Sequence, residues 1–151
     1  MKTLICIFLV VNCPVFSFGQ IKVFAEAFVT YASSNGQDIT NIAVENNEVI
    51  VFYTSDDDGL IYMSNYWVKT DSQSYGELTS TKKTKKTTYH SFKADVQFYT
   101  WHYINSYDTN QGYAKIKLTK IYKPNQVAYI MEIFPENNDE LVYKGELKGE
   151  L

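Results

Sequence analysis

The chain has few residues of the kinds that build metal centres. Histidine occurs twice, as His90 and His102, and both cysteines, Cys6 and Cys13, fall within the first 19 residues. On one extended strand the two histidines would lie roughly 40 Å apart, at about 3.3 Å per residue. Structural and catalytic zinc sites draw on several histidine and cysteine ligands at once. The sequence therefore predicts no metal and no other cofactor.

Acidic and hydroxyl residues can also do chemistry without a metal. Glu26 and Glu132 each stand within an apolar stretch, and a pair of carboxylates is the catalytic machinery of most glycosidases. An outward-facing glutamate in an alternating strand needs no such role. No Gly-x-Ser-x-Gly nucleophile motif occurs. The acidic residues 56–58 are consecutive, whereas an EF-hand calcium loop places its ligands at alternate positions. We therefore predict that the protein is not an enzyme.

Aromatic residues are the strongest chemical signal. The sequence contains 13 Tyr and 2 Trp, side chains that combine a large apolar body with a polar tip. Small β proteins use them as core filler, but they also suit ligand pockets and protein interfaces. One hypothesis is a binding protein that holds a small apolar or sugar ligand among Trp67, Tyr99, Trp101 and Tyr103. The alternative is a protein-interaction module that uses an exposed aromatic face or a strand edge.

The elements that must position these residues centre on a predicted hairpin over residues 93–122. Residues 96–104 are dense in aromatic and β-branched side chains, and residues 107–112 supply turn chemistry. Residues 113–122 then alternate apolar with polar side chains, which is typical of a strand with one buried face. Because Trp101 stands in the middle of the first strand, we expect it to be at least partly buried.

Further strands are predicted on both sides of this hairpin. Residues 21–31 fit either a strand or a helical stripe, and their β-branched and aromatic content favours a strand. The other predicted strands are 39–44, 49–54, 60–68, 127–134 and 141–147. About eight sequential antiparallel strands predict one all-β domain over residues 20–151, a meander that forms a small barrel or strongly curled sheet. A β-sandwich is the alternative.

Residues 79–88 interrupt the strand pattern. They contain four lysines and no apolar residue, so they cannot contribute to a core. This composition predicts a mobile, projecting loop. The lysine pairs could dock on an anionic surface, but a solvated loop is the simpler interpretation.

The first 19 residues are predicted to be a secretory signal peptide. Lys2 supplies the positive charge, residues 4–11 are apolar, and residues 17–19 place small residues before a cleavage site ahead of Gln20. Cys13 raises a lipoprotein as the less favoured alternative. The sequence therefore predicts a secreted or periplasmic protein.

The charge of the remaining chain bears on its partners. Without Lys2 it carries 13 basic and 17 acidic residues, a net charge of −4. A weakly acidic chain without an arginine cluster is a poor match for nucleic acid. No stretch after residue 19 is long and apolar enough to be a membrane span. The expected partner is an unidentified small ligand or a protein.

The layout resembles a group of small secreted proteins of Bacteroidota. The shared features are a phenylalanine and alanines in an opening strand, paired Ile/Val-rich strands, a central Trp strand, an Asp-x-x-x-Gly turn and closing strands with tyrosine. Here they are Phe24 to Ala27, Ile42 to Phe52, Trp101, Asp108 to Gly112 and Tyr129 to Tyr143. The likeness covers most of residues 21–147, although this chain lacks a cysteine that the group carries after that turn. The resemblance implies an all-β fold and no particular activity.

Overall fold

The computed structural model describes residues 20–151, and this part of the chain is almost entirely β-structure. A short helix, α2 (Thr40–Glu45), and a 3-10 turn, η1 (Val68–Thr70), accompany the strands. Within the described residues there are ten strands: β1 (Ile21–Ser34), β2 (Gln37–Asp38), β3 (Glu48–Ser55), β4 (Ile61–Trp67), β5 (Ser72–Ser80), β6 (Lys85–Tyr89), β7 (Phe92–Asn105), β8 (Gln111–Lys123), β9 (Gln126–Pro135) and β10 (Leu141–Gly149).

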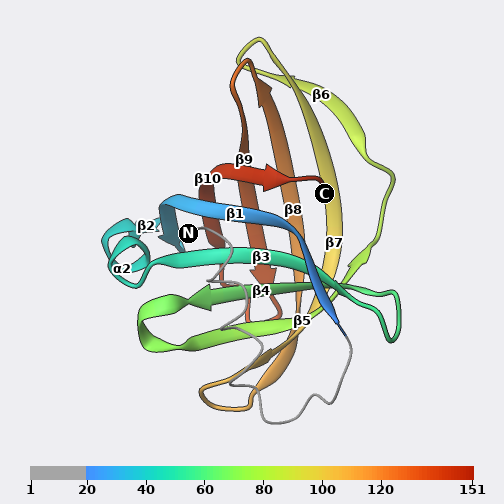
Figure 1. Cartoon of the computed structure of the whole chain (residues 1–151). Coiled ribbons are helices and arrows are strands. Elements are labelled where there is room, and N and C mark those ends of the chain that lie inside the picture. The colour runs from blue at the N-terminus through green and yellow to red at the C-terminus, as the bar shows by residue number, and fades with distance from the viewer. Residues whose placement is uncertain (1–19) are drawn as a thin grey trace.

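Eight of the strands in residues 20–151 close into an antiparallel barrel (Figure 1). Around the wall the order is β1, β3, β4, β5, β7, β8, β9 and β10, and β10 pairs back onto β1. The other two strands extend the wall, because β2 pairs with the end of β1 and β6 with the start of β7. The prediction of an all-β meander that forms a barrel is confirmed, and the sandwich alternative is excluded.

The predicted leader, residues 1–19, lies outside the described residues, as does the lipoprotein alternative at Cys13. Residues 21–31 form part of β1, which confirms the strand favoured by their composition. No helix in residues 20–151 is long and apolar enough to cross a bilayer.

The prediction of a strand over residues 39–44 is wrong, because most of them form α2. Ile42 and Val44 alternate as in a strand, but they are 53% and 52% exposed. The residues that meet the core are instead Ile39 and Ala43, which are one helical turn apart. A helix therefore packs two apolar residues of this segment, Ile39 and Ala43, against the core from one face, whereas the two residues of the strand pattern, Ile42 and Val44, stay exposed.

The prediction of a loop over residues 79–88 is also wrong at both of its ends. Residues 79–80 complete β5 and residues 85–88 belong to β6, which leaves 81–84 as the link between them. All residues of β6 are exposed. Strand pairing is made by backbone groups, so a lysine- and threonine-rich segment can pair with β7 without entering the core. Mobility of this segment stays a prediction.

Inward-pointing side chains fill the barrel. Trp101 is 4% exposed, and its Nε1 donates a hydrogen bond to the carbonyl oxygen of Met63 at 3.3 Å. This confirms the prediction that Trp101 is buried. An eight-stranded barrel is just wide enough for side chains to fill its interior. The innermost large side chains, each at most 1% exposed, are Ile50, Phe52, Met63, Leu118, Tyr129, Met131 and Ile133.

Small residues let the wall bend and close. A Cβ atom on Gly76 would lie 1.8 Å from the carbonyl oxygen of His102, and one on Gly145 would lie 1.8 Å from that of Phe28. Both glycines therefore stand where neighbouring backbones approach most closely. The buried residues of β1 are also small, which leaves room above this strand for larger side chains; they are Ala25, Ala27, Ala32 and Ser33.

The two ends of the barrel differ in how they are covered. We call the end where β3 begins the α2 end, because α2 packs there against β1 and β3. At the opposite end, Leu151 packs against the core and its main-chain oxygen accepts a hydrogen bond from the ammonium of Lys120. Lys120 is 7% exposed, and this burial lowers its pKa. The end opposite α2 therefore holds a charged group away from water.

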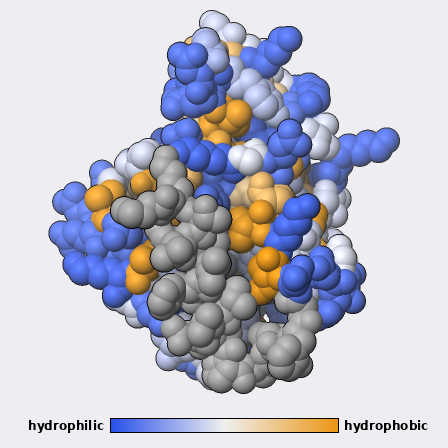
Figure 2. Space-filling view, in the orientation of Figure 1, coloured by the Kyte–Doolittle hydropathy of each residue, from blue (hydrophilic) through white to orange (hydrophobic). Residues whose placement is uncertain are grey.

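Hydrophilic side chains predominate on the face of the molecule that Figure 2 shows. Figure 2 shows the apolar side chains of one face as small patches separated by hydrophilic ones.

Beyond the barrel proper, β7, β8 and β9 project upwards together with β6 (Figure 1). On this projection the ammonium of Lys86 pairs with the carboxylate of Asp95 at 2.7 Å, and the Tyr122 hydroxyl donates to the same carboxylate at 2.9 Å.

The burial of Trp101 predicts the cost of removing it. Trp101→Ala should lower the free energy of unfolding by about 3 to 5 kcal/mol, because a buried aromatic ring leaves a large cavity. Trp67 is 37% exposed, so the matched variant Trp67→Ala should cost under about 1 kcal/mol. Urea melts of both variants measure the difference. Equal losses would show that Trp101 does not belong to the core.

The glycines of the wall give a second stability prediction. Gly76→Ala should cost about 3 kcal/mol or more, because the new methyl group meets a fixed backbone carbonyl. Gly112→Ala is the control: its Cβ would approach only the side chain of Tyr103, with the hydroxyl nearest at 2.9 Å, and that side chain can move. Its cost should be under about 1 kcal/mol. Similar melting temperatures for the two variants would contradict this account of the bend.

Candidate functional site

Polar side chains gather inside the barrel at the α2 end. Along β3 and β4 the alternation that buries Ile50 and Met63 also turns Glu48 and Asn65 inward. Tyr143 of β10 joins them from across the barrel, and Trp67 stands at the last position of β4. We call these four residues, Glu48, Asn65, Trp67 and Tyr143, the mouth cluster.

The strand register brings β3 and β4 members of the mouth cluster together. Glu48 is directly opposite Trp67, and Asn65 is directly opposite Ile50. Glu48 and Asn65 are therefore diagonal neighbours on one face, which places them roughly 7–8 Å apart. Side chains of this length can meet over such a distance.

Tyr143 reaches the mouth cluster over the wall strand β1. It is opposite Ala32, whose small side chain leaves space for the ring. The Asn65 Nδ2 donates a hydrogen bond to the Tyr143 hydroxyl at 3.2 Å, and the Glu48 carboxylate is near enough to this hydroxyl to raise its pKa. Tyr143 therefore links the acid of β3 to the amide of β4.

Two oxygens of the mouth cluster have no hydrogen-bond partner in the protein. They are Oε1 of Glu48 and Oδ1 of Asn65, and both atoms are buried. Glu48 as a whole is 6% exposed. Buried polar atoms normally have a partner, since an unsatisfied one costs about 1 to 3 kcal/mol. This pair of acceptors is therefore the strongest sign of a binding site in the described chain.

The buried carboxylate also changes the acidity of its neighbours. Burial raises the pKa of Tyr143, and the negative charge of Glu48 raises that pKa further. Burial likewise raises the pKa of Tyr129, with the Glu48 charge as the second cause. Both tyrosines therefore stay protonated, and their hydroxyls remain hydrogen-bond donors near the carboxylate.

Further polar and aromatic groups surround the mouth cluster. Ser74 is opposite Asn65, and its hydroxyl donates to Oδ1 of Asn105 at 2.6 Å. Tyr103 is paired with Gly76 on one side and Gly112 on the other, and its ring covers Gly112. These glycines give the ring space that larger side chains would fill.

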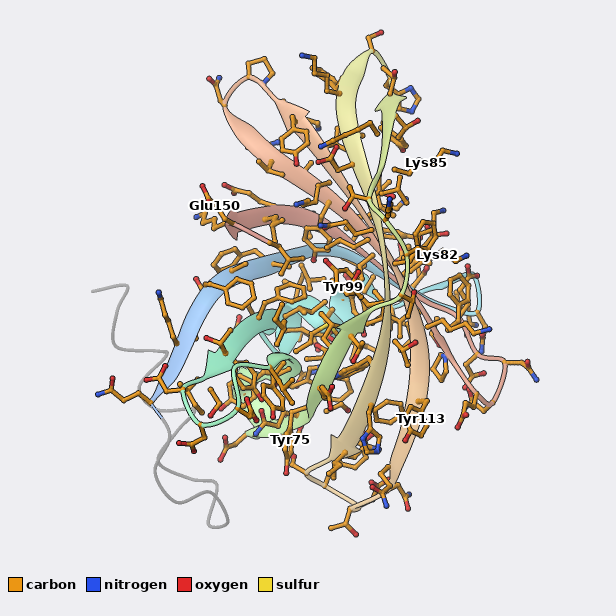
Figure 3. The ribbon with its side chains drawn as sticks, turned by 90° about the vertical axis from the view of Figure 1, so that its right-hand side faces the viewer. Tyr75, Lys82, Lys85, Tyr99, Tyr113 and Glu150 are labelled. Carbon is orange, nitrogen blue, oxygen red and sulfur yellow. The ribbon has the colours of Figure 1, made fainter. Side chains whose placement is uncertain are left out.

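The aromatic residues singled out in the sequence lie at different depths. Trp67 belongs to the mouth cluster, and Tyr103 lies beside the same end of the barrel. The rings of Trp101 and Tyr103 are 5.1 Å apart between centroids, so Trp101 lies below Tyr103 in the core. Tyr99 is 9% exposed and lies near the middle of the molecule in Figure 3. The four residues therefore do not share one surface.

Tyr99 contributes instead to a shallow hollow beside the link between β5 and β6. The hollow has a volume of about 280 Å³, close to the lower limit of small-molecule sites. At the edge of the hollow, the Lys82 ammonium lies 5.0 Å from the centroid of the Phe98 ring. The remaining lining residues are Thr81, Thr100, Lys115 and Ile116. This hollow holds no buried atom of the kind found in the mouth cluster.

The other chemical candidates from the sequence remain separate. Glu132 pairs with Lys117 at 2.7 Å, whereas Glu26 lies on β1 opposite Lys148. The prospective glycosidase pair is therefore not formed. His102 stacks on Tyr113, with 4.6 Å between the ring centroids, whereas His90 lies in the turn after β6. Among residues 20–151, no three His, Cys, Asp or Glu side chains gather in a way that could hold a metal ion.

The acidic run of residues 56–58 forms a turn. The Asp58 carboxylate accepts hydrogen bonds from the Leu60 backbone at 2.8 Å and from the Tyr62 hydroxyl. These bonds lower the pKa of Asp58, with the Tyr62 bond as the larger cause. The Asp58–Tyr62 bond, followed by burial, raises the pKa of Tyr62 to about 12. Asp58 therefore serves to fix the β3–β4 turn.

Sequence reasoning missed Glu48, Asn65 and Tyr143. The predicted strand over residues 49–54 leaves out Glu48, although β3 begins at Glu48 and the turn after α2 is formed by Asn46 and Asn47. The available signal was the alternation itself: Glu48 precedes Ile50 and Phe52 by even steps, and Asn65 stands between Met63 and Trp67. A polar residue in the inward register of a strand marks a site or a structural network.

Comparison with models of known protein families, with curated proteins and with solved structures finds no match to this chain.

The raised tyrosine pKa values predict how stability depends on pH. Tyr143 ionises near pH 10 when unfolded but at higher pH when folded, so its contribution is present below pH 10 and is lost as the pH rises further. Urea melts between pH 8 and pH 11 should show falling stability, with a shallower fall in Tyr143→Phe. The control is Tyr107→Phe, at a residue that is 65% exposed. An unchanged slope in Tyr143→Phe would contradict the buried placement of the hydroxyl.

Proposed function

We propose that the protein binds a small polar ligand, of the size of a sugar, at the mouth cluster without chemically changing it. The observation that carries the proposal is the pair of buried acceptors, Oε1 of Glu48 and Oδ1 of Asn65, at the end of a closed barrel. A ligand that donates hydrogen bonds to both would remove the cost of leaving them unpaired.

The packing of the interior favours a polar ligand over an apolar one. Ile50 and Met63, the next inward residues of β3 and β4, are 0% exposed and fill the space below the mouth cluster. An apolar ligand needs an enclosed apolar cavity. A polar ligand needs only the mouth cluster and an aromatic surface beside it, and Trp67 supplies that surface. Of the two ligand classes considered from the sequence, a sugar is therefore better supported than a small apolar molecule.

A protein-interaction module is the second candidate, favoured by exposed apolar residues around the same end. Ile42 and Val44 are more than half exposed, and Val68 is 36% exposed. The backbone of Lys69 donates to the carbonyl oxygen of Asn46 at 3.1 Å, which ties η1 to the end of α2. The two candidates differ in the substitution that abolishes binding: Asn65→Leu for a small ligand, and Ile42→Ser for a protein partner.

A titration followed by NMR tests the small-ligand proposal. Neutral and amino monosaccharides are the polar probes and decanoate is the apolar one, with the indole N–H signals of Trp67 and Trp101 as reporters. At least one sugar should shift the Trp67 signal and leave that of Trp101 nearly unchanged, because only Trp67 lies at the mouth cluster. Asn65→Leu should weaken this binding by about 10-fold, the effect of losing one good hydrogen bond in a buried site.

Thr100→Val is the matched control, since Thr100 lies at the hollow beside Phe98 and not at the mouth cluster. Its affinity for the sugar should equal that of the unmodified protein. Binding of decanoate alone, with the Trp67 signal unmoved, would refute the assignment of the site to this end of the barrel.

A further inference from the structure

The unpaired buried atoms of the described chain are all of one chemical kind. Among residues 20–151 the buried side-chain nitrogen and oxygen atoms without a partner are Oε1 of Glu48, Oδ1 of Asn65 and Oε1 of Gln97. Each of them is an acceptor. A ligand that matches the mouth cluster must therefore bring donors.

Several donors around the mouth cluster are engaged within the protein. One N–H of the Asn65 amide is bonded to the Tyr143 hydroxyl, and the Glu48 charge acts on that same hydroxyl. The Ser74 hydroxyl is bonded to Asn105 at 2.6 Å. A neutral sugar hydroxyl is both a donor and an acceptor, whereas the two unpaired buried oxygens need donors only.

From these contacts we infer that the polar group recognised at the mouth cluster is a protonated primary amine of a small molecule. An ammonium group has three donors and no acceptor, which complements two free acceptor oxygens. One of those oxygens carries the charge of a carboxylate held away from water, where a charge-assisted hydrogen bond is strongest. This inference rests on the proposed function and names the chemistry of its ligand.

Trp67 supplies a second feature that suits a cation. It is directly opposite Glu48 on the neighbouring strand, so their Cβ atoms are about 4.5–5.5 Å apart. A cation bound at the carboxylate therefore lies within reach of the indole face, which attracts cations within about 6 Å. Because Trp67 is 37% exposed, the rest of the ligand can extend along it towards solvent.

The interior limits how far the ligand enters. Ile50 is opposite Asn65 and is fully buried, so the amine is held at the level of Glu48 and its attached body stays at the mouth. Amino sugars and short alkylamines satisfy this limit, since each carries a compact ammonium group on a body of modest size.

Glucosamine and glucose test the inference, because the two sugars differ only in that glucosamine has an amine where glucose has one of its hydroxyl groups. At pH 6, where the amine is protonated, glucosamine should bind the purified protein at least about 10-fold more tightly than glucose, the gain of one charge-assisted bond. Glu48→Gln keeps the shape and removes the charge, so it should abolish this preference. Glu150→Gln is the control, since Glu150 is exposed near the other end of the barrel (Figure 3).

Trp67→Leu keeps the test decisive if the substitution of the buried Glu48 prevents folding. It alters an exposed position and should lower the affinity for glucosamine several-fold while the melting temperature stays nearly unchanged.

The outcomes separate the inference from the proposed function. If glucose binds as tightly as glucosamine, and Asn65→Leu weakens both, the ammonium inference is overturned and binding of a small polar ligand at the mouth cluster stands. If neither compound nor any other sugar shifts the Trp67 signal, both are overturned, and the two acceptors serve to hold solvent. A preference for glucosamine that survives in Glu48→Gln overturns the role given to the carboxylate.

Discussion

The structure depends on the pairing of β1 with β10, which closes the sheet into a barrel. The register runs from Ala25 opposite Gly149 to Ser34 opposite Leu141, and it joins parts of the chain more than a hundred residues apart. Without it both strands would be exposed edges, a hazard that closure removes. Alanines on β1 and Gly145 on β10 permit the close approach of the two strands. Every inside and outside position in the wall follows from this closure.

Closure also decides where chemistry can take place. A barrel of eight strands has an interior that side chains fill, and a charge in its middle would lose its water without finding partners. The inward-facing charged residues accordingly stand near the ends: Glu48 opens β3, whereas Lys120 and Asp95 lie towards the opposite end of the barrel. Lys120 and Asp95 are satisfied by the protein, but Glu48 keeps one oxygen unpaired. Of these three charged residues, only Glu48, at the α2 end, therefore keeps an oxygen without a hydrogen-bond partner.

Much of the fold could be predicted because strand patterning is local. Alternation of apolar and polar side chains, turn residues and β-branched content identified most of the strands, the barrel and the burial of Trp101. The two errors have local causes as well. Residues 39–44 alternate like a strand, but Ile39 and Ala43 meet the core at helical spacing. Residues 85–88 have no apolar side chain, yet they pair with β7 through their backbone, which composition does not report.

The sequence by itself determined most of the strand-forming segments, the alternation of side chains along them, and the absence of cysteine after residue 19. It could not determine the mouth cluster, because Glu48, Asn65 and Tyr143 come from three strands whose contact depends on register and closure. Tyr143 reaches Asn65 only because β10 returns to β1 and Ala32 leaves room for its ring. The amino-acid sequence shows which side chains of one strand alternate. Which side chains of different strands meet inside the barrel is decided only when all the strands are paired.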